Sequence, residues 1–204
     1  MAEPKTPLEP DKFYHIYNRG INACPIFIEE TNYIYFLELV NKHITPIAEI
    51  YSWVLMRNHF HFLLKIKSIE ELNEIIPNYK TITALGRNRI NQQFSNIFNA
   101  YSKAFNKKYN RTGSLFEKGF HRKNVNSNDY LLKLIIYIHI NPVNHGVSKS
   151  PKEYEWSSYN EINKMENDIS KKVIDLFDDL ENFKFVHLTK TDETKLTKWV
   201  GLNV

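Results

Sequence analysis

The amino-acid sequence predicts an α+β domain with a mostly antiparallel sheet. Segments of strand and helix character follow one another in the first half of the chain in the order strand, helix, two strands, helix. Hydrophobic residues make up 42% and aromatic residues 14% of the 204 residues, which is enough to build a core and argues against a disordered chain. The length fits one domain with appendages.

Each expected element has a local signal. Ser68 and Glu71 have the spacing of a capping box, which predicts the start of a short helix. Thr31 is the candidate N-cap of the first helix, and Pro46 follows its end. In chain order we expect a strand at 13–18, a helix at 31–44, strands at 50–55 and 59–67, helices at 68–77 and from there to 109, an extended segment at 114–125, and helices at 130–140 and near 169–180.

Aromatic residues recur along the long helix after Pro77. They follow one another at steps of four, three, four and four, which places them on one helix face: Phe94, Phe98, Tyr101, Phe105 and Tyr109. Such a stripe could stack on nucleobases, but core packing is the commoner cause, and we expect these rings in the core.

The helix at 130–140 is apolar nearly all round and must be buried. Asn128-Asp129 supplies its expected cap. Tyr137 and Asn141 are four residues apart, so they lie on one face, one turn from each other. Pro142 predicts that Asn141 is the last residue of the helix, because the residue before proline is steered away from α geometry. A C-cap is therefore another explanation of this asparagine.

Two histidines, His59 and His61, stand one residue apart in an apolar strand. Strand side chains alternate, so both imidazoles share one face and Phe60 points to the other. Burying this pair costs free energy unless each ring finds a hydrogen-bond partner or a metal. The local pattern allows both a metal site and two core histidines bonded to backbone carbonyls.

Positive charge is concentrated in one segment of the chain. Residues 79–123 contain ten basic residues and one acidic residue, Glu117, whereas the rest of the chain contains 17 basic and 22 acidic residues. Such polarisation attracts phosphate backbones, so nucleic acid is the expected partner. The candidate DNA-binding residues are Arg87, Arg89, Lys103, Lys107, Lys108, Arg111, Lys118, Arg122 and Lys123.

Several classes of protein are disfavoured. No apolar run approaches the roughly 18–20 residues that cross a bilayer, and the polar, proline-containing start of the chain has no signal core. A single cysteine, Cys24, excludes an internal disulfide framework and a multi-cysteine zinc site. We expect a cytoplasmic protein that does not bind membranes.

The two motifs together suggest phosphoryl chemistry. His59, His61 and Asn141 would offer two nitrogens and an oxygen to a divalent ion, a harder set than that of a structural zinc site. Mg²⁺ or Mn²⁺ fits such a set. Tyr137 would then attack a phosphodiester and form a 5′-phosphotyrosine, which conserves the bond energy for rejoining.

The same residues resemble the REP-associated tyrosine transposases, which are HUH enzymes with a single catalytic tyrosine. His59-Phe60-His61 is similar to the HUH motif, and Tyr137 to Val143 resembles the family's Tyr-Ile-x-x-Asn-Pro-Val segment. The motifs cover about residues 11–160 in the family's order and also include Tyr14 to Gly20, Met56 to His61, Arg111 to Phe116 and Trp156-Ser-Ser.

This resemblance implies a ferredoxin-like core, with a flexible N-terminus at 1–10, a catalytic domain at 11–150 and a helical C-terminal appendage at 151–204. It implies cleavage and transfer of single-stranded or hairpin repeat DNA, with Tyr137 as nucleophile and His59, His61 and Asn141 as metal ligands. His139 is then expected in packing or at a phosphate. His15 could line the site or be a plain strand histidine.

Other functions stay open at this point. A domesticated relative could hold DNA hairpins without cutting them, and would need only the basic segment. A replication initiator or plasmid relaxase is disfavoured by the order of the motifs, and a structural zinc domain by the donor set. The resemblance allows both a monomer and a homodimer.

Overall fold

The computed structural model describes residues 6–76 and 83–189, with the backbone alone for residues 83–88. Its strands are β1 (Phe13–Arg19), β2 (Ala48–Met56), β3 (His59–Ile66) and β4 (His121–Val125). Its α-helices are α1 (Glu30–His43), α2 (Ile69–Ile75), α3 (Thr83–Lys108), α4 (Asn128–Asn144), α5 (Tyr159–Lys164), α6 (Asp168–Asp175) and α7 (Leu180–Leu188), and short 3-10 turns lie at Ile21–Ala23 and Pro151–Glu153.

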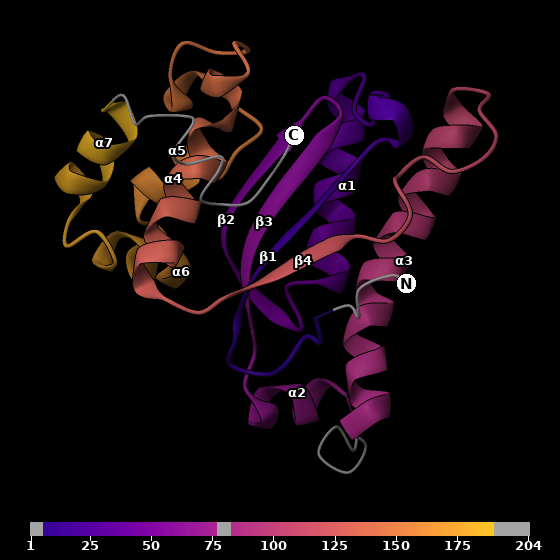
Figure 1. Cartoon of the computed structure of the whole chain (residues 1–204), viewed down its shortest axis with the longest axis horizontal. Helices are drawn as coiled ribbons and strands as arrows, with labels where there is room; N and C mark the ends of the chain where they lie inside the picture. The colour runs from indigo at the N-terminus through magenta and orange to yellow at the C-terminus, as the bar shows by residue number, and fades with distance from the viewer. Residues whose placement is uncertain (1–5, 77–82, 190–204) are drawn as a thin grey trace.

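The strands form one antiparallel sheet in the order β2-β3-β1-β4 (Figure 1). Because β3 lies between β1 and β2 and is antiparallel to both, β1 and β2 run parallel to each other and α1 connects them. This split βαβ arrangement is that of a ferredoxin-like fold. The expected α+β class is therefore confirmed.

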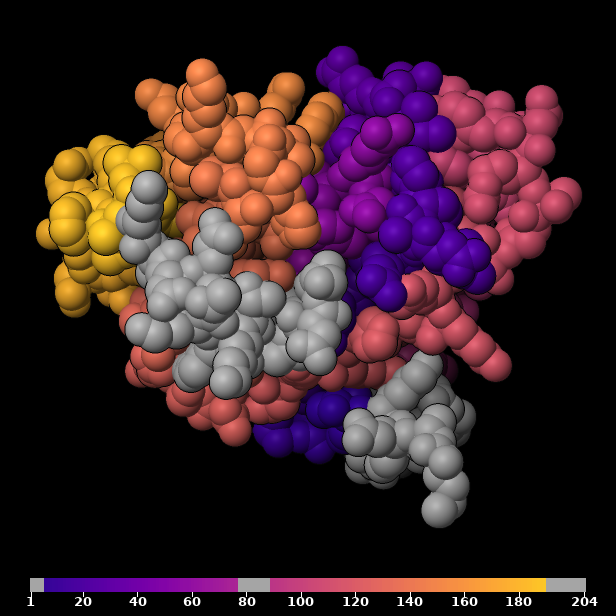
Figure 2. All heavy atoms as spheres, turned by 45° about the horizontal axis from the view of Figure 1, so that its top comes forward, coloured from indigo at the N-terminus to yellow at the C-terminus, as the bar shows by residue number. Residues whose placement is uncertain are grey.

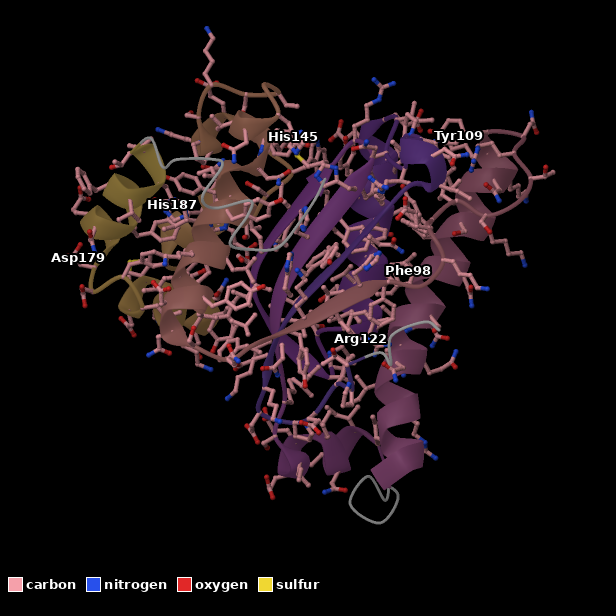
Figure 3. All side chains as sticks on the ribbon, in the orientation of Figure 1. Phe98, Tyr109, Arg122, His145, Asp179 and His187 are labelled. Atoms are coloured by element: carbon pink, nitrogen blue, oxygen red, sulfur yellow. The ribbon has the colours of Figure 1, made fainter. Side chains whose placement is uncertain are left out.

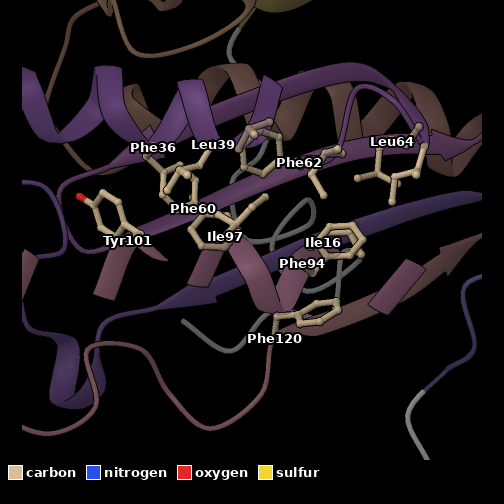
Figure 4. Close-up of a cluster of buried hydrophobic side chains, with 14 of the residues drawn as sticks. Ile16, Phe36, Leu39, Phe60, Phe62, Leu64, Phe94, Ile97, Tyr101 and Phe120 are labelled. Atoms are coloured by element: carbon tan, nitrogen blue, oxygen red, sulfur yellow. The ribbon is translucent and has the colours of Figure 1, made fainter. Parts of the chain in front are cut away.

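One face of the sheet packs against α1 and α3. The even-numbered residues of β3 point to this face, where Phe60, Phe62 and Leu64 join side chains of both helices (Figure 4). The aromatic stripe of α3 lies in this core as expected, with three rings buried and the rings of Phe98 and Tyr109 partly buried against them. The helical spacing of these aromatic residues therefore reflects core packing, as predicted, and not stacking on nucleobases.

The opposite face packs against α4, and the C-terminal helices surround α4. Side chains of α6 and α7, among them Val173 and Phe183, share a second core with α4 and the odd-numbered residues of β3. The orange-to-yellow helices α5 to α7 consequently lie on the side of the molecule away from α3 (Figure 1 and Figure 2). Among the described residues, none of the helices has the length and apolar character that crossing a membrane requires.

Side-chain caps place two helix starts. The Ser68–Glu71 capping box is confirmed, because each side chain bonds the other residue's backbone N–H. The prediction of Thr31 as N-cap is wrong, since α1 begins at Glu30 after a reciprocal cap between Glu29 and Asn32. The Asn32 amide oxygen also accepts from the Ile28 N–H, which tightens this entry.

The helix that carries the tyrosine differs from its expected bounds. Ser127, whose side chain accepts from the Tyr130 N–H, is its N-cap, and α4 continues through Pro142 to Asn144. Asn141 is therefore inside the helix and is not its last residue. The turn after the proline is closed by bonds from the His145 N–H to the Asn141 carbonyl and from the Val147 N–H to the Pro142 carbonyl.

Three other expectations change in detail. The extended segment at 114–125 is a strand only from His121, preceded by an isolated bridge between Phe116 and Gly20. The helix expected near 169–180 is α6 and ends earlier, at Asp175, while a further helix, α7, begins at Leu180 after a turn in which Asp178 has a φ of 70°. Leu8, in the segment expected to be flexible, is fully buried.

Candidate functional site

The odd-numbered residues of β3 and one turn of α4 form the candidate site. His59 and His61 point from β3 to the face that α4 covers, and Tyr137 and Asn141 lie one turn apart on that helix. The ring centroids of the two histidines are 5.2 Å apart, and that of Tyr137 lies 5.5 Å from that of His61, edge to face. All four side chains are buried. The fold therefore brings these four residues together, as the sequence predicts.

His59 lies between two amide oxygens. Its Nδ1 is 2.8 Å from the Asn58 Oδ1, and its Nε2 is 3.1 Å from the Asn141 Oδ1. Burial lowers the pKa of His59 to about 4, although its hydrogen bond to Asn141 opposes this shift, so the ring is neutral at pH 7 and has one N–H. It can donate to only one of the two oxygens.

The tautomer of His59 follows from its neighbours. The Asn58 amide nitrogen donates to the Ala23 carbonyl at 3.4 Å, which turns its Oδ1 toward the imidazole. In the tautomer with the proton on Nδ1, the Nδ1–H donates to Asn58 and the Nε2 lone pair faces the Asn141 oxygen. Two acceptors 3.1 Å apart repel each other unless a positive charge lies close to both.

His61 is hydrogen-bonded to another buried histidine, His15 of β1. The His61 Nδ1 is 3.0 Å from the His15 Nε2, and the rings are stacked. Burial lowers the pKa of both, that of His15 to about 3. Among the described residues, the His61 Nε2 has no hydrogen-bond partner although it is buried. If the Nδ1–H of His61 donates to His15, this Nε2 offers a lone pair.

These atoms fit a divalent cation. With the protons of both rings on Nδ1, the His59 Nε2, the Asn141 Oδ1 and the orphaned His61 Nε2 would all be metal donors, and two donors on one small ion are typically ~3 Å apart. In the described part of the chain no three His, Cys, Asp or Glu side chains are placed to hold a metal. This set falls outside that class because its third member is an amide.

Tyr137 is held as a neutral phenol. Burial raises its pKa to about 12, a hydrogen bond with the Asn141 side chain opposes the rise, and Tyr17 adds to it. Its side chain is only 2% exposed. A neutral phenol is a poor nucleophile, so chemistry at this oxygen needs nearby positive charge and an opening that admits a substrate.

Most of the basic segment lies on the far face of the sheet. Lys103, Lys107 and Lys108 are exposed residues of α3, which packs on the face opposite to the histidines. Lys108 also forms an ion pair with Glu29. Arg89 is exposed on the same helix, and the side chain of Arg87 lies outside the described residues. The fold does not bring these candidates to Tyr137.

The remaining basic candidates are divided between two places. Arg122 points to the α3 face, where its guanidinium lies over the Phe120 ring and bonds Asn91 (Figure 3). Lys118 follows Phe116, whose bridge to Gly20 places it at the end of the sheet where His59 begins β3. The Arg111 guanidinium lies against α3, where it donates to the Asn106 Oδ1 and lies over the Phe105 ring. Lys123 is paired with His15 in register and is the candidate on the histidine face.

His139 has a structural role, and the alternative of a phosphate contact is ruled out by its complete burial. Its Nδ1 is 2.9 Å from the His187 Nε2, and its Nε2 is 2.9 Å from the Ser158 Oγ. The His187 Nδ1–H donates to the Phe183 carbonyl at 2.7 Å, which leaves its Nε2 as acceptor. This chain of bonds joins α4 to α7 and, through the Trp53 N–H that donates to Ser158, to β2.

Three residues near the site carried little signal in the sequence. His15 contacts His61, Tyr17 lies beside both, and the exposed His145 has its ring centroid 5.2 Å from that of His59. The period-two pattern of β1 puts His15 and Tyr17 on one face, but only the strand register shows which face. His145 follows α4 at the mouth of the site.

Comparison with known proteins supports the fold. No protein-family model matches the sequence, and a comparison with curated proteins finds no relative. The structure of a REP-associated tyrosine transposase bound to a REP hairpin is similar, with a TM-score of 0.54 and 16% identity over 83% of this chain and 90% of that one. The resemblance seen in the sequence is thus confirmed for the fold.

Proposed function

We propose that this protein is a metal-dependent enzyme that cleaves and transfers single-stranded DNA through a 5′-phosphotyrosine at Tyr137, in the manner of an HUH transposase. The observation that carries the proposal is the cluster of His59, His61 and Asn141 beside the phenol of Tyr137. Within this cluster the His61 Nε2 is buried without a hydrogen-bond partner among the described residues, which a purely structural role does not explain.

The three ligand residues would hold Mg²⁺ or Mn²⁺, because nitrogen and amide oxygen donors without thiolate suit these ions. When bound, such an ion polarises the scissile phosphate and neutralises charge that develops during transfer. Asn58 keeps the His59 Nε2 unprotonated, and His15 can do the same for His61. These second contacts fix both rings before a ligand arrives.

Tyr137 would attack the phosphorus while the 3′ oxygen leaves, so one P–O bond forms as another breaks. The phenol loses its proton to solvent during this step and the departing 3′ oxygen takes one up as a 3′ hydroxyl, so the number of protons is unchanged. The Asn141 side chain, which hydrogen-bonds the phenol, stabilises the phenolate and also offers its oxygen to the ligand set. One residue thereby couples the nucleophile to the metal site.

The DNA partner is supported by charge and by the fold. The similar transposase is bound to a REP hairpin, and the basic segment of this chain would meet phosphates. The exposed lysines of α3 lie on the face opposite to Tyr137, so we place any contact with them outside the cleavage centre. Lys118 and Lys123 are closer to the histidine site and would contact the strand near the scissile phosphate.

The test is incubation of the protein with labelled DNA hairpins that carry single-stranded flanks, with Mn²⁺, followed by a denaturing gel. A covalent protein–DNA adduct should form with the wild type and disappear with Tyr137→Phe, whose binding should stay within a few-fold of the wild type. Tyr130→Phe on the same helix is the matched control and should keep the adduct. Adduct formation by Tyr137→Phe contradicts the assignment.

A second candidate is a hairpin-binding protein that does not cut. The burial of Tyr137 favours it, because a phosphodiester cannot reach a phenol that is 2% exposed unless covering segments move. In that case wild-type protein binds hairpins with high affinity and yields no adduct with any divalent ion.

A further inference from the structure

Three rings form a continuous row across the sheet, beginning at the candidate site. His61, Tyr17 and His121 are directly opposite one another on β3, β1 and β4. The ring centroids of His61 and Tyr17 are 5.7 Å apart, and those of Tyr17 and His121 are 4.9 Å apart with the planes only 11° from parallel. The rings therefore stand on the sheet one beside another, with their faces turned along the row.

The row ends in solvent. His61 is buried, Tyr17 is half-buried and His121 is exposed, at the start of the edge strand β4 (Figure 1). Each inner ring has an aromatic neighbour on both sides, whereas the outward face of His121 is the terminal position of the stack. A flat aromatic group would extend the row at this position.

We propose that the outward face of His121 binds a single-stranded nucleobase, with Tyr17 supporting the histidine from behind. This inference rests on the proposed function for its ligand, because it assigns a position on the same DNA strand. Stacking accepts any base, so the subsite would hold the strand without reading its sequence. A cross-strand aromatic pair stabilises the sheet, and the outer ring of this pair also presents an exposed face to a ligand.

The charge around the row suits a nucleotide. Lys123 follows two residues after His121 on the same face of β4, and Arg19 follows two residues after Tyr17 on β1. These side chains flank the row with positive charge, where the phosphates on either side of a stacked base would lie. Arg19 is also paired with Glu117, which holds its guanidinium at this end of the strand.

The position along the DNA follows from strand spacing. Neighbouring strands are about 4.8 Å apart, so His121 lies roughly 10 Å from His61 across β1. Stacked nucleotides rise about 3.4 Å each, so the base on His121 is within about three nucleotides of the scissile phosphate. The proposal therefore predicts one stacked position close to the cleavage point.

The experiment measures binding by the Tyr137→Phe protein without metal, so that cleavage does not interfere. The probes are DNA hairpins with a mixed-sequence single-stranded flank, the same hairpins without the flank, and flanked hairpins with an abasic site at each position near the junction. His121→Ala removes the ring and His121→Phe keeps one. His121 is exposed, so neither change should prevent folding.

His121→Ala should weaken binding of the flanked hairpin by about five- to hundredfold, the loss typical of one stacked base. His121→Phe should restore it, and neither variant should change binding of the hairpin without a flank. At one position in the flank, an abasic site should weaken binding by the parent protein as much as His121→Ala does. The same abasic site should not change binding by the His121→Ala variant.

Equal binding of the flanked hairpin by the parent and His121→Ala overturns this subsite while leaving the proposed function intact. A loss that is the same with and without the flank also overturns it. If the parent protein binds neither hairpin, the DNA partner itself fails, and the proposed function fails with the subsite.

Discussion

The buried pair His139–His187 makes the stability of this protein depend on pH. Both rings must stay neutral, because the Nδ1–H of His139 donates to the His187 Nε2 and a proton on that nitrogen would put two donors face to face. Burial lowers the pKa of His187 to about 4, although its bond to the Phe183 carbonyl opposes the shift. The unfolded chain binds this proton near pH 6.5, so it gains protons first as pH falls.

The difference between the folded and unfolded pKa of His187 determines how the free energy of unfolding changes with pH. Above the unfolded pKa both states are neutral and the stability is at its full value, and between pH 6.5 and 4 the unfolded state is increasingly favoured. At about pH 5, His187 alone should lower the free energy of unfolding by about 2 kcal/mol relative to pH 7. The other buried histidines act in the same direction.

His187→Gln isolates this contribution, because glutamine offers an acceptor to His139 and does not titrate near pH 5. Urea unfolding at about pH 7, 6 and 5 should show a smaller loss of stability for this variant, by about 2 kcal/mol at the lowest pH. Leu188→Gln, an exposed change on the same helix, is the control and should keep the wild-type pH dependence. Identical pH dependence of His187→Gln and wild type would refute the reasoning.

Three further predictions concern the core, a turn and the ligand set. Phe60→Ala removes a buried ring between β3, α1 and α3, so urea unfolding should show a loss of about 3–5 kcal/mol, and a loss below about 1 kcal/mol would contradict the packing. Gly20→Ala puts a Cβ 2.1 Å from the Cys24 carbonyl oxygen, a backbone atom, and should lower Tm, whereas an unchanged Tm would mean that this turn is not as tight as described. Saturating Mn²⁺ should raise the Tm of the wild type, by the equivalent of about 2.7 kcal/mol at a hundredfold excess over Kd, and should not raise that of His61→Ala; the same rise in both would remove His61 from the ligand set.

The fold was predictable because its signals are local. The alternation of β3 separates Phe60 and Phe62 from His59 and His61, and the order of strands and helices limits the sheet topology. The bounds were less predictable. The start of α1 depends on the reciprocal cap between Glu29 and Asn32, and glutamate is not among the preferred N-cap residues, whereas threonine at position 31 is.

The candidate site was predictable where its residues share one element. Tyr137 and Asn141 are one turn apart whatever the rest of the chain does, and His59 and His61 share a face of their strand. The partnership of His15 with His61 depends on the register between β1 and β3, which the separate segments do not encode. The basic segment could not be assigned to the site, since α3 and β4 place its charges on both faces of the sheet.

Pro142 explains why the site depends on the whole of α4 and on the helices around it. A proline in a helix interior typically costs about 3 kcal/mol relative to alanine, and it removes the N–H that would bond the Ile138 carbonyl. The helix nevertheless continues, because its apolar sides are buried against β2 and α7 and because His139 is hydrogen-bonded to His187 of α7 and to Ser158, which precedes α5. If α4 ended at Asn141, this residue would lie at a helix terminus, and its side-chain amide would not be held beside His59. Packing by the C-terminal helices therefore keeps Asn141 in helical register with Tyr137, and this register places the amide oxygen 3.1 Å from the His59 Nε2.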